Sequence, residues 1–317
     1  MEVLAQIFNT ELLVATIRLS TPITLAAVGA TICERSGVVN IAMEGMMIVG
    51  AFTGLIGAMF TGDPWLGLLF AVLAGGVFSL LHAFATVSLH LEHVVSGAVL
   101  NILAFGIVRY MMVMIFGHPG TTDPIRFSLK NYQWAIPGLS KIPVLGPIFF
   151  NQTPIIYFSF LLIIFFTFFL KKTKLGLHIK AAGEHPLALE TIGVSVYKMR
   201  YTGVFISGMM AGLAGAYLSI ENAVSFTEGM SSGRGFIAMA AMISGGWTPI
   251  GAFIASLFFG FADALQVRLQ VALELSIPEE LFIILPYVLT VVAVAGLVRK
   301  SRAPKADGVD FMIERPE

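Results

Sequence analysis

The stretch Pro154–Leu170, with the sequence PIIYFSFLLIIFFTFFL, contains no charged residue and is followed directly by Lys171, Lys172 and Lys174. A helix of about 20 apolar residues crosses the ~30 Å hydrocarbon core of a bilayer. Backbone amides and carbonyls have no water to bond inside lipid, so the stretch is expected to be helical. It therefore predicts a transmembrane helix that ends at a cluster of lysines.

Further stretches of the same kind run along the chain, and they are Leu12–Ile32, Ile41–Phe60, Trp65–His90, Val94–Phe116, Tyr201–Ile220, Pro249–Gln270 and Leu281–Val298. A shorter, glycine-rich stretch covers Arg234–Gly246. The sequence thus predicts an all-α, polytopic membrane helical bundle with about 8–10 transmembrane segments. Residues 1–317 are expected to form one transmembrane domain.

The composition supports a membrane protein and excludes several other classes. Hydrophobic residues make up 57% of the 317 residues and charged residues 12%, whereas soluble domains average about 25% charged residues. So few charges cannot cover a soluble globule. The single cysteine, Cys33, excludes an internal disulfide and is expected to be a small buried side chain. A net charge of zero gives no field that would attract nucleic acid.

Basic residues are concentrated in two segments, residues 171–200 and the tail 299–317. Because short cytoplasmic loops carry an excess of Lys and Arg, both segments are predicted to be cytoplasmic. Five predicted spans precede residue 171, so the N-terminus is expected outside. The proline-rich connection 117–153 is then extracytoplasmic. Between Arg200 and Arg299 an even number of crossings is needed to return to the cytoplasmic side. The four stretches there supply it only if the short stretch Arg234–Gly246 also crosses the membrane.

Motifs for catalysis are missing or out of context. No glycine is followed by lysine, so the chain has no P-loop for ATP. The zinc motif H-E-x-x-H is missing too, and no metal site is predicted. Residues 229–233, GMSSG, fit G-x-S-x-G, but that motif marks a nucleophile only in an α/β sheet. We therefore expect a protein that performs no covalent chemistry.

Polar residues within predicted spans are costly and are candidates for function. Asn40 and Glu44 stand four residues apart at the start of the second predicted span, so they are expected on one helix face. The alternative for Glu44 is a buried ion pair with one of three arginines, Arg18, Arg35 or Arg109. For Asn101 and Ser244 the alternative is hydrogen bonding between helices. Arg109 and Asp263 are expected to be structural or interfacial.

Two groups of small residues predict close helix packing. Gly208, Gly212, Gly215 and Ala216 share one helix face, and Gly50 and Gly54 share another. Small side chains let helix backbones approach each other within a membrane.

The segment AAGEHPLALETIG, residues 181–193, is predicted to be a linker, a helix of about two turns and a stop. Pro186 suits the first helical turn and Gly193 suits the C-terminal end. The helix would expose Leu187, Leu189 and Ile192 on the cytoplasmic side. They could pack against the protein's own spans or against a partner subunit, and the pattern does not separate these two alternatives.

Three ordered blocks of the chain resemble a known family. They are TPITLAAVGA through ERSGVVNIAMEG (residues 21–45), the AGE-to-Gly193 stretch (residues 182–193), and GRGFIA through GGWTPIGA (residues 233–252). They are similar to blocks of the branched-chain amino acid, ribose and nucleoside permeases, which are membrane subunits of ATP-binding-cassette (ABC) importers. The sequences of residues 40–45 and 245–249 most resemble those of the shorter of the two permeases in nucleoside importers.

The resemblance implies an importer permease for nucleosides, with purine nucleosides favoured, in the cytoplasmic (inner) membrane of a bacterium. It implies three partners: a second related permease, an ATPase with two nucleotide-binding domains that holds ATP and Mg²⁺, and a substrate-binding lipoprotein. This chain itself is expected to bind no cofactor. A simple-sugar permease and an ion-coupled secondary transporter are the alternatives.

The proposed importer permease predicts two sets of functional residues, one for the substrate path and one for the contact with the ATPase. A path for a nucleoside would suit an aromatic ring, amides and other polar groups, and the candidates are Asn40, Glu44, Asn101, Ser244 and Trp247. The similarity to the family's coupling loop assigns the contact with the ATPase to Glu184, His185, Pro186, Leu187, Ala188, Leu189, Glu190 and Gly193.

Overall fold

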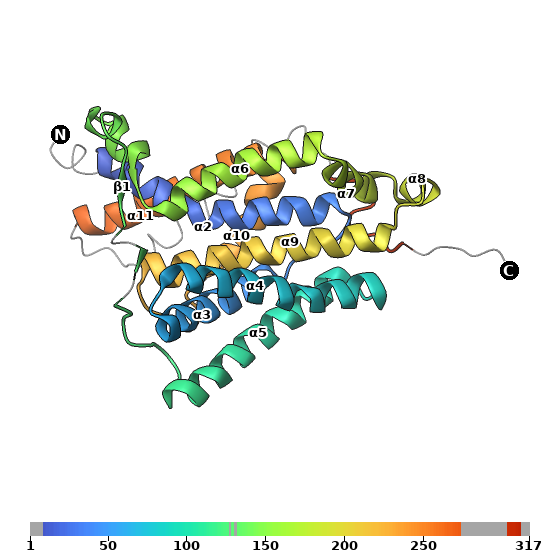
Figure 1. Cartoon of the computed structure of the whole chain (residues 1–317), viewed down its shortest axis with the longest axis horizontal. Helices are drawn as coiled ribbons and strands as arrows, with labels where there is room; N and C mark the ends of the chain where they lie inside the picture. The colour runs from blue at the N-terminus through green and yellow to red at the C-terminus, as the bar shows by residue number, and fades with distance from the viewer. Residues whose placement is uncertain (1–8, 127, 130–131, 274–302, 312–317) are drawn as a thin grey trace.

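The computed structural model describes residues 9–126, 128–129, 132–273 and 303–311, and shows an elongated bundle of helices (Figure 1). Its helices are α2 (Thr10–Arg35), α3 (Met43–Thr61), α4 (Pro64–Ala83), α5 (His93–Phe116), α6 (Pro154–Lys172), α7 (Lys174–Glu184), α8 (Pro186–Thr191), α9 (Val196–Ala216), α10 (Arg234–Ser244) and α11 (Pro249–Leu273). Short π-helical turns, Phe84–Ser88 and Tyr217–Asn222, extend α4 and α9.

Within the described residues, seven helices are long and apolar enough to cross a membrane. These are α2, α3, α4, α5, α6, α9 and α11, and each corresponds to one of the stretches predicted from the sequence. The all-α membrane bundle is therefore confirmed. The last predicted span, Leu281–Val298, lies outside the described residues.

The bundle has two distinct ends (Figure 1). One end, which we call the basic end, is formed by α7, α8 and the tail segment 303–311, and the Ala306 amide there donates to the Gly183 carbonyl at 2.8 Å. The opposite end holds a small hairpin in which β1 (Trp134–Ala135) pairs antiparallel with β2 (Asn151–Gln152). Residues 171–200 and the described part of the tail, residues 303–311, thus share one end. Which face of the membrane that end meets stays a prediction.

Helices α3, α4 and α9 pack closely against one another at glycine residues. A side-chain carbon on Gly50 would overlap the backbone of Gly212, and one on Gly75 would overlap the carbonyl of Gly208. A side-chain carbon on Gly215 would overlap the carbonyl of Met47. The predicted close packing of small residues is confirmed, because only glycine allows these backbones to touch.

The connection between α6 and α9 is more helical than its sequence predicts. Instead of a linker, residues Lys174–Glu184 form α7, whose first turn is capped by the Thr173 hydroxyl accepting from the Gly176 amide at 3.1 Å. The predicted short helix follows as α8, and Gly193 ends the segment at a φ of +80°. The linker prediction was wrong because α7 packs on α6 and α9 and is stabilised there.

Candidate functional site

The segment between α2 and α3, residues 36–42, is buried although it is not helical. Side chains from neighbouring elements satisfy its backbone, as buried polar groups require. The Val39 amide donates to His93 Nδ1 at 3.1 Å, and the Val39 carbonyl accepts from His82 Nε2 at 2.9 Å. We call this stretch the broken segment. It joins the end of α2 to the start of α3 through two short turns, at residues 36–37 and 41–42.

Asn40 and Asn101 both hold the broken segment in place. The Asn40 amide nitrogen donates to Ser207 Oγ at 3.1 Å, and its oxygen accepts from the Ala42 amide. The Asn101 amide nitrogen donates to the Ile41 carbonyl at 3.0 Å, and its oxygen accepts from the Gly45 amide at 2.8 Å. The prediction that Asn40 and Glu44 share a helix face was wrong, because α3 begins only at Met43. For Asn101 the structure shows the alternative of interhelical hydrogen bonding.

Glu44 caps the first turn of α10. Its buried carboxylate accepts from the Gly233 amide at 2.8 Å, from the Gly235 amide at 2.7 Å and from the Ser231 hydroxyl. The expected alternative, an ion pair with an arginine, is not formed among the described residues. A carboxylate is favourable here because the N-terminus of a helix carries partial positive charge. Ser231 of the GMSSG motif thus serves this cap and sits on no strand-to-helix turn.

Ser244 and Trp247 lie at the other end of α10. Trp247 adopts a φ of +52°, its indole Nε1 donates to Glu34 Oε2 at 2.5 Å, and its carbonyl accepts from Arg35 Nε at 2.9 Å. Ser244 is the last residue of α10. Of the five predicted pathway residues, Glu44 therefore lies at one end of this 11-residue helix and Ser244 and Trp247 lie at the other, while Asn40 and Asn101 bond to the segment before α3. With a rise of about 1.5 Å per residue, α10 is about half as long as a full span.

A cavity of about 330 Å³ lies against the second half of α5, and none of the five predicted residues lines it. Figure 1 shows α5 diverging from α3 and α4 toward its C-terminal end. The cavity occupies the space between α3, α5 and the segment that precedes α10. Its lining consists of Ile48, Ile102, Phe105, Gly106, Val108, Arg109, Phe226, Glu228 and Gly229.

Two antiparallel segments close one side of this cavity. The Thr122 amide donates to the Phe226 carbonyl at 2.9 Å, and the Ile125 amide donates to the Val224 carbonyl at 2.8 Å. The Phe226 ring is fully buried and meets Phe52 edge-on at 5.3 Å. This side of the cavity is formed by residues far apart in sequence, so it could not be predicted from the individual apolar stretches.

The polar groups of the cavity are Arg109 and Glu228. Glu228 Oε1 accepts from the Gly120 amide at 3.3 Å, and Arg109 forms no ion pair within the part of the chain that the structure describes. An aromatic ring, a cation and a carboxylate around one cavity can stack on a flat ligand and bond to its edges. Sequence reasoning missed Phe105 and Glu228. Phe105 could have been found from the sequence, because Ile102, Phe105 and Arg109 are spaced to lie on one face of a helix.

The short helix α8 divides its apolar residues between two environments. Leu187 and Ile192 are 70% and 67% exposed, whereas Leu189 is 2% exposed and packs with Ala182, Val196 and Phe311. The expectation that Leu189 is exposed was wrong, because the chain's own tail covers it. Leu187 stays available to a partner, and the assignment of α8 to an ATPase contact stays a prediction.

The tail segment 303–311 connects α8 to the broken segment. Besides covering Leu189, it bonds through the Gly308 amide to the Gly37 carbonyl at 3.2 Å, and Tyr197 Oη donates to the Phe311 carbonyl at 2.9 Å. Asp307 lies next to Glu34, and burial together with that neighbouring carboxylate raises the pKa of Asp307 to about 9. The tail therefore links α8 to the start of the broken segment through direct contacts with both.

The described part of the chain thus combines seven helices long and apolar enough to span a membrane, a half-length helix capped by a buried carboxylate, and a cavity next to the segment before that helix. This combination fits a multi-pass membrane permease. The chain matches the model of the family described as branched-chain amino acid transport system / permease component over residues 12–294. It belongs to that family.

Named relatives match along nearly the whole chain. The guanosine ABC transporter permease protein NupQ of Bacillus subtilis (strain 168) is 44% identical over 94% of this chain and 95% of its own length. The nucleoside ABC transporter permease protein NupC of Lactococcus lactis is 38% identical over 92% of this chain and 94% of its own length. A putative glucose ABC transporter permease protein of Haloferax volcanii, TsgC13, is 38% identical over 83% of this chain and 79% of its own length.

The first two organisms each supply a second, more distant match. NupP of Bacillus subtilis and NupB of Lactococcus lactis, also named as guanosine or nucleoside permeases, are each 26% identical to this chain. Homologous permeases of these importers thus come in pairs.

Proposed function

We propose that this chain is one of two permease subunits of an ABC importer that carries nucleosides across the cytoplasmic membrane of a bacterium. The full-length similarity to two nucleoside permeases, at 44% and 38% identity, is the observation that carries the proposal. A putative glucose permease matches a smaller share of the chain, which leaves a simple sugar as the second candidate cargo. Membership in a transport-system permease family weighs against an ion-coupled transporter.

The 330 Å³ cavity suits a small, flat ligand with hydrogen-bonding edges. Ligand sites commonly enclose about 300–1,000 Å³ and combine apolar walls with a few polar groups. Phe105 would stack on a base, and Arg109 and Glu228 would bond to its edges. A pyranose sugar offers the ring only a partial face of C–H groups, whereas a nucleobase offers a whole aromatic face, so the aromatic side chain favours a nucleoside.

The partner subunits complete this proposal. The cavity lies against α5, the least buried of the seven long helices, so a second permease packed on α5 would close it. The pairing of relatives within one organism supports that partner. A separate ATPase would supply the energy through exposed Leu187, and a substrate-binding lipoprotein would deliver cargo to the opposite end.

Uptake by the assembled transporter tests the cargo. The chain would be produced with its second permease and ATPase and reconstituted in liposomes with ATP inside and the substrate-binding lipoprotein outside. Uptake of labelled guanosine would be measured with unlabelled guanosine or ribose as competitors. We expect ATP-dependent uptake that guanosine, but not ribose, abolishes. Phe105→Ala should raise the KM for guanosine, whereas Phe168→Ala on an exposed face away from the cavity should not. Uptake that needs an ion gradient but no ATP would refute the proposal.

A further inference from the structure

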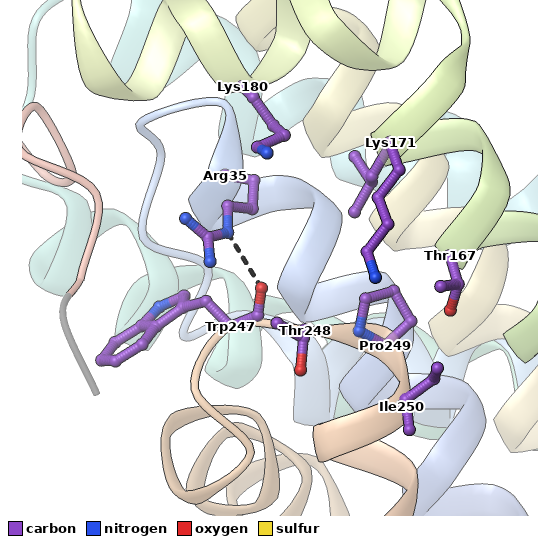
Figure 2. Close-up of a pocket in the computed structure, with 9 residues that line it drawn as sticks. Arg35, Thr167, Lys171, Lys180, Trp247, Thr248, Pro249 and Ile250 are labelled. Carbon is purple, nitrogen blue, oxygen red and sulfur yellow. Dashed lines mark hydrogen bonds between the residues drawn. The ribbon is translucent and has the colours of Figure 1, made fainter. Parts of the chain in front are cut away.

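A second pocket lies at the basic end of the bundle, distant in sequence and position from the cavity beside α5 (Figure 2). It has a volume of about 140 Å³ and lies between α6, α7, the end of α2 and the turn that joins α10 to α11. Its lining residues are Arg35, Thr167, Leu170, Lys171, Lys180, Trp247, Thr248, Pro249 and Ile250.

Three cations from three helices converge on this pocket. Arg35 is already engaged, since its Nη1 pairs with Glu184 at 3.3 Å and its Nε donates to the Trp247 carbonyl. Lys171 and Lys180 have no carboxylate within 4.0 Å among the described residues. In a chain whose net charge is zero, two uncompensated ammonium groups at one pocket attract an anion.

The pocket also lies where the apolar surface of the bundle begins. Lys171 is the first charged residue after the apolar stretch of α6, and Ile164 and Phe168 continue its helix face with 68% and 60% exposure. On α11, Ile250 and Ile254 are 48% and 61% exposed. The two helices touch through Phe160 and Phe253, whose rings are 5.8 Å apart. An anion bound here would therefore sit directly above two exposed apolar helix faces.

We propose that this pocket binds the phosphate headgroup of an anionic phospholipid. Lys171 and Lys180 would hold the phosphate, and the acyl chains would lie along the exposed faces of α6 and α11. Basic pockets at the membrane boundary between helices are suited to anionic headgroups. A soluble phosphate would use the same cations but would leave the apolar faces uncovered, which is why the lipid is favoured.

Lipid binding to the full-length chain tests the proposal. Native mass spectrometry in detergent would measure binding of phosphatidylglycerol, with phosphatidylcholine and inorganic phosphate as comparison ligands. The variant Lys171→Gln/Lys180→Gln should bind phosphatidylglycerol about tenfold more weakly than the unchanged chain, because each lysine contributes electrostatic attraction. The matched control is Lys172→Gln/Lys174→Gln, which removes the same charge from exposed positions outside the pocket and should bind normally.

Three results would overturn the proposal. Equal loss in the control variant would show diffuse attraction to the whole basic end. Equal binding of phosphatidylcholine would show that the charge of the headgroup is irrelevant. Displacement of the lipid by inorganic phosphate at the same concentration would identify a soluble-anion site. Equal melting temperatures of both double variants without lipid will show that both are folded. The single variant Lys171→Gln removes one charge and tests the same lipid binding with a smaller change.

Discussion

At the scale of single residues, Glu44 is an acidic side chain buried inside the bundle, which is rare in a membrane interior. It is buried and charged, and it is acceptable there because two backbone amides and a hydroxyl donate to it. These donors would be left without partners if the carboxylate were removed. The cap therefore fixes where α10 begins relative to α3.

Substitution of Glu44 should show this role. We expect Glu44→Ala to destabilise the protein by about 2 kcal/mol, because hydrogen bonds to a charged group are lost and buried amides stay unpaired. Glu44→Gln keeps one acceptor and should lose less stability while still lowering uptake. The measurements are the melting temperature and nucleoside uptake at matched membrane levels, with Glu92→Gln at an exposed position as control. Normal uptake by Glu44→Gln would contradict the role.

Asp307 makes the docking of the tail dependent on pH. Its pKa is raised from an ordinary 3.8 to about 9, so the docked tail holds a proton that the released tail gives up above about pH 4. Rising pH should thus favour release progressively up to about pH 9. The charged groups that face Asp307 are Glu34, Arg200 and Arg35. Glu34 raises the pKa of Asp307, and the two arginines oppose that rise.

Hydrogen exchange of residues 303–311, corrected for the intrinsic pH dependence, measures this release. Protection should be lower at pH 8.5 than at pH 6 in the unchanged chain. In Asp307→Asn, which resembles the protonated carboxyl, protection should be the same at both values. A pH effect of equal size in the variant would assign it to another group.

At the scale of elements, α8 should separate partner binding from folding. Leu187→Asp places a charge on an exposed position, so we expect normal insertion and melting but loss of the ATPase during purification. Leu189→Asp places a charge in a packed site and should destabilise α8 and the tail, because an unpaired buried charge is costly. Co-purification and melting curves distinguish these effects. Retention of the ATPase by Leu187→Asp would show that α8 is not the contact.

The elements also show how far sequence reasoning reaches here. Long apolar helices such as α6 could be located within a few residues, because lipid requires an apolar length that is visible in the sequence. The path of the broken segment could not, although residues 33–40 fall between two predicted spans, because the backbone partners of Val39, which are His82 and His93, come from other helices. Leu189 was misplaced for the same reason, because residue Phe311 covers it from the far end of the chain.

At the scale of the whole molecule, the arrangement of the two ends predicts labelling from one side only. In a Cys33→Ser background, Lys141→Cys on the hairpin end should react with an impermeant thiol reagent added to intact cells. Lys172→Cys at the basic end should react only after the membrane is opened. The reverse pattern would invert the orientation predicted from the basic residues.

The glycine contacts among α3, α4 and α9 set a limit on sequence change in this protein. At Gly50, Gly75 and Gly215 even a methyl group would meet backbone, which cannot rotate aside as a side chain can. In a library of all single substitutions selected for growth on the transported compound, these three positions should tolerate no replacement. Positions around the cavity, lined by adaptable side chains, should tolerate several. The least replaceable residues of this permease would then be ones that never touch its cargo.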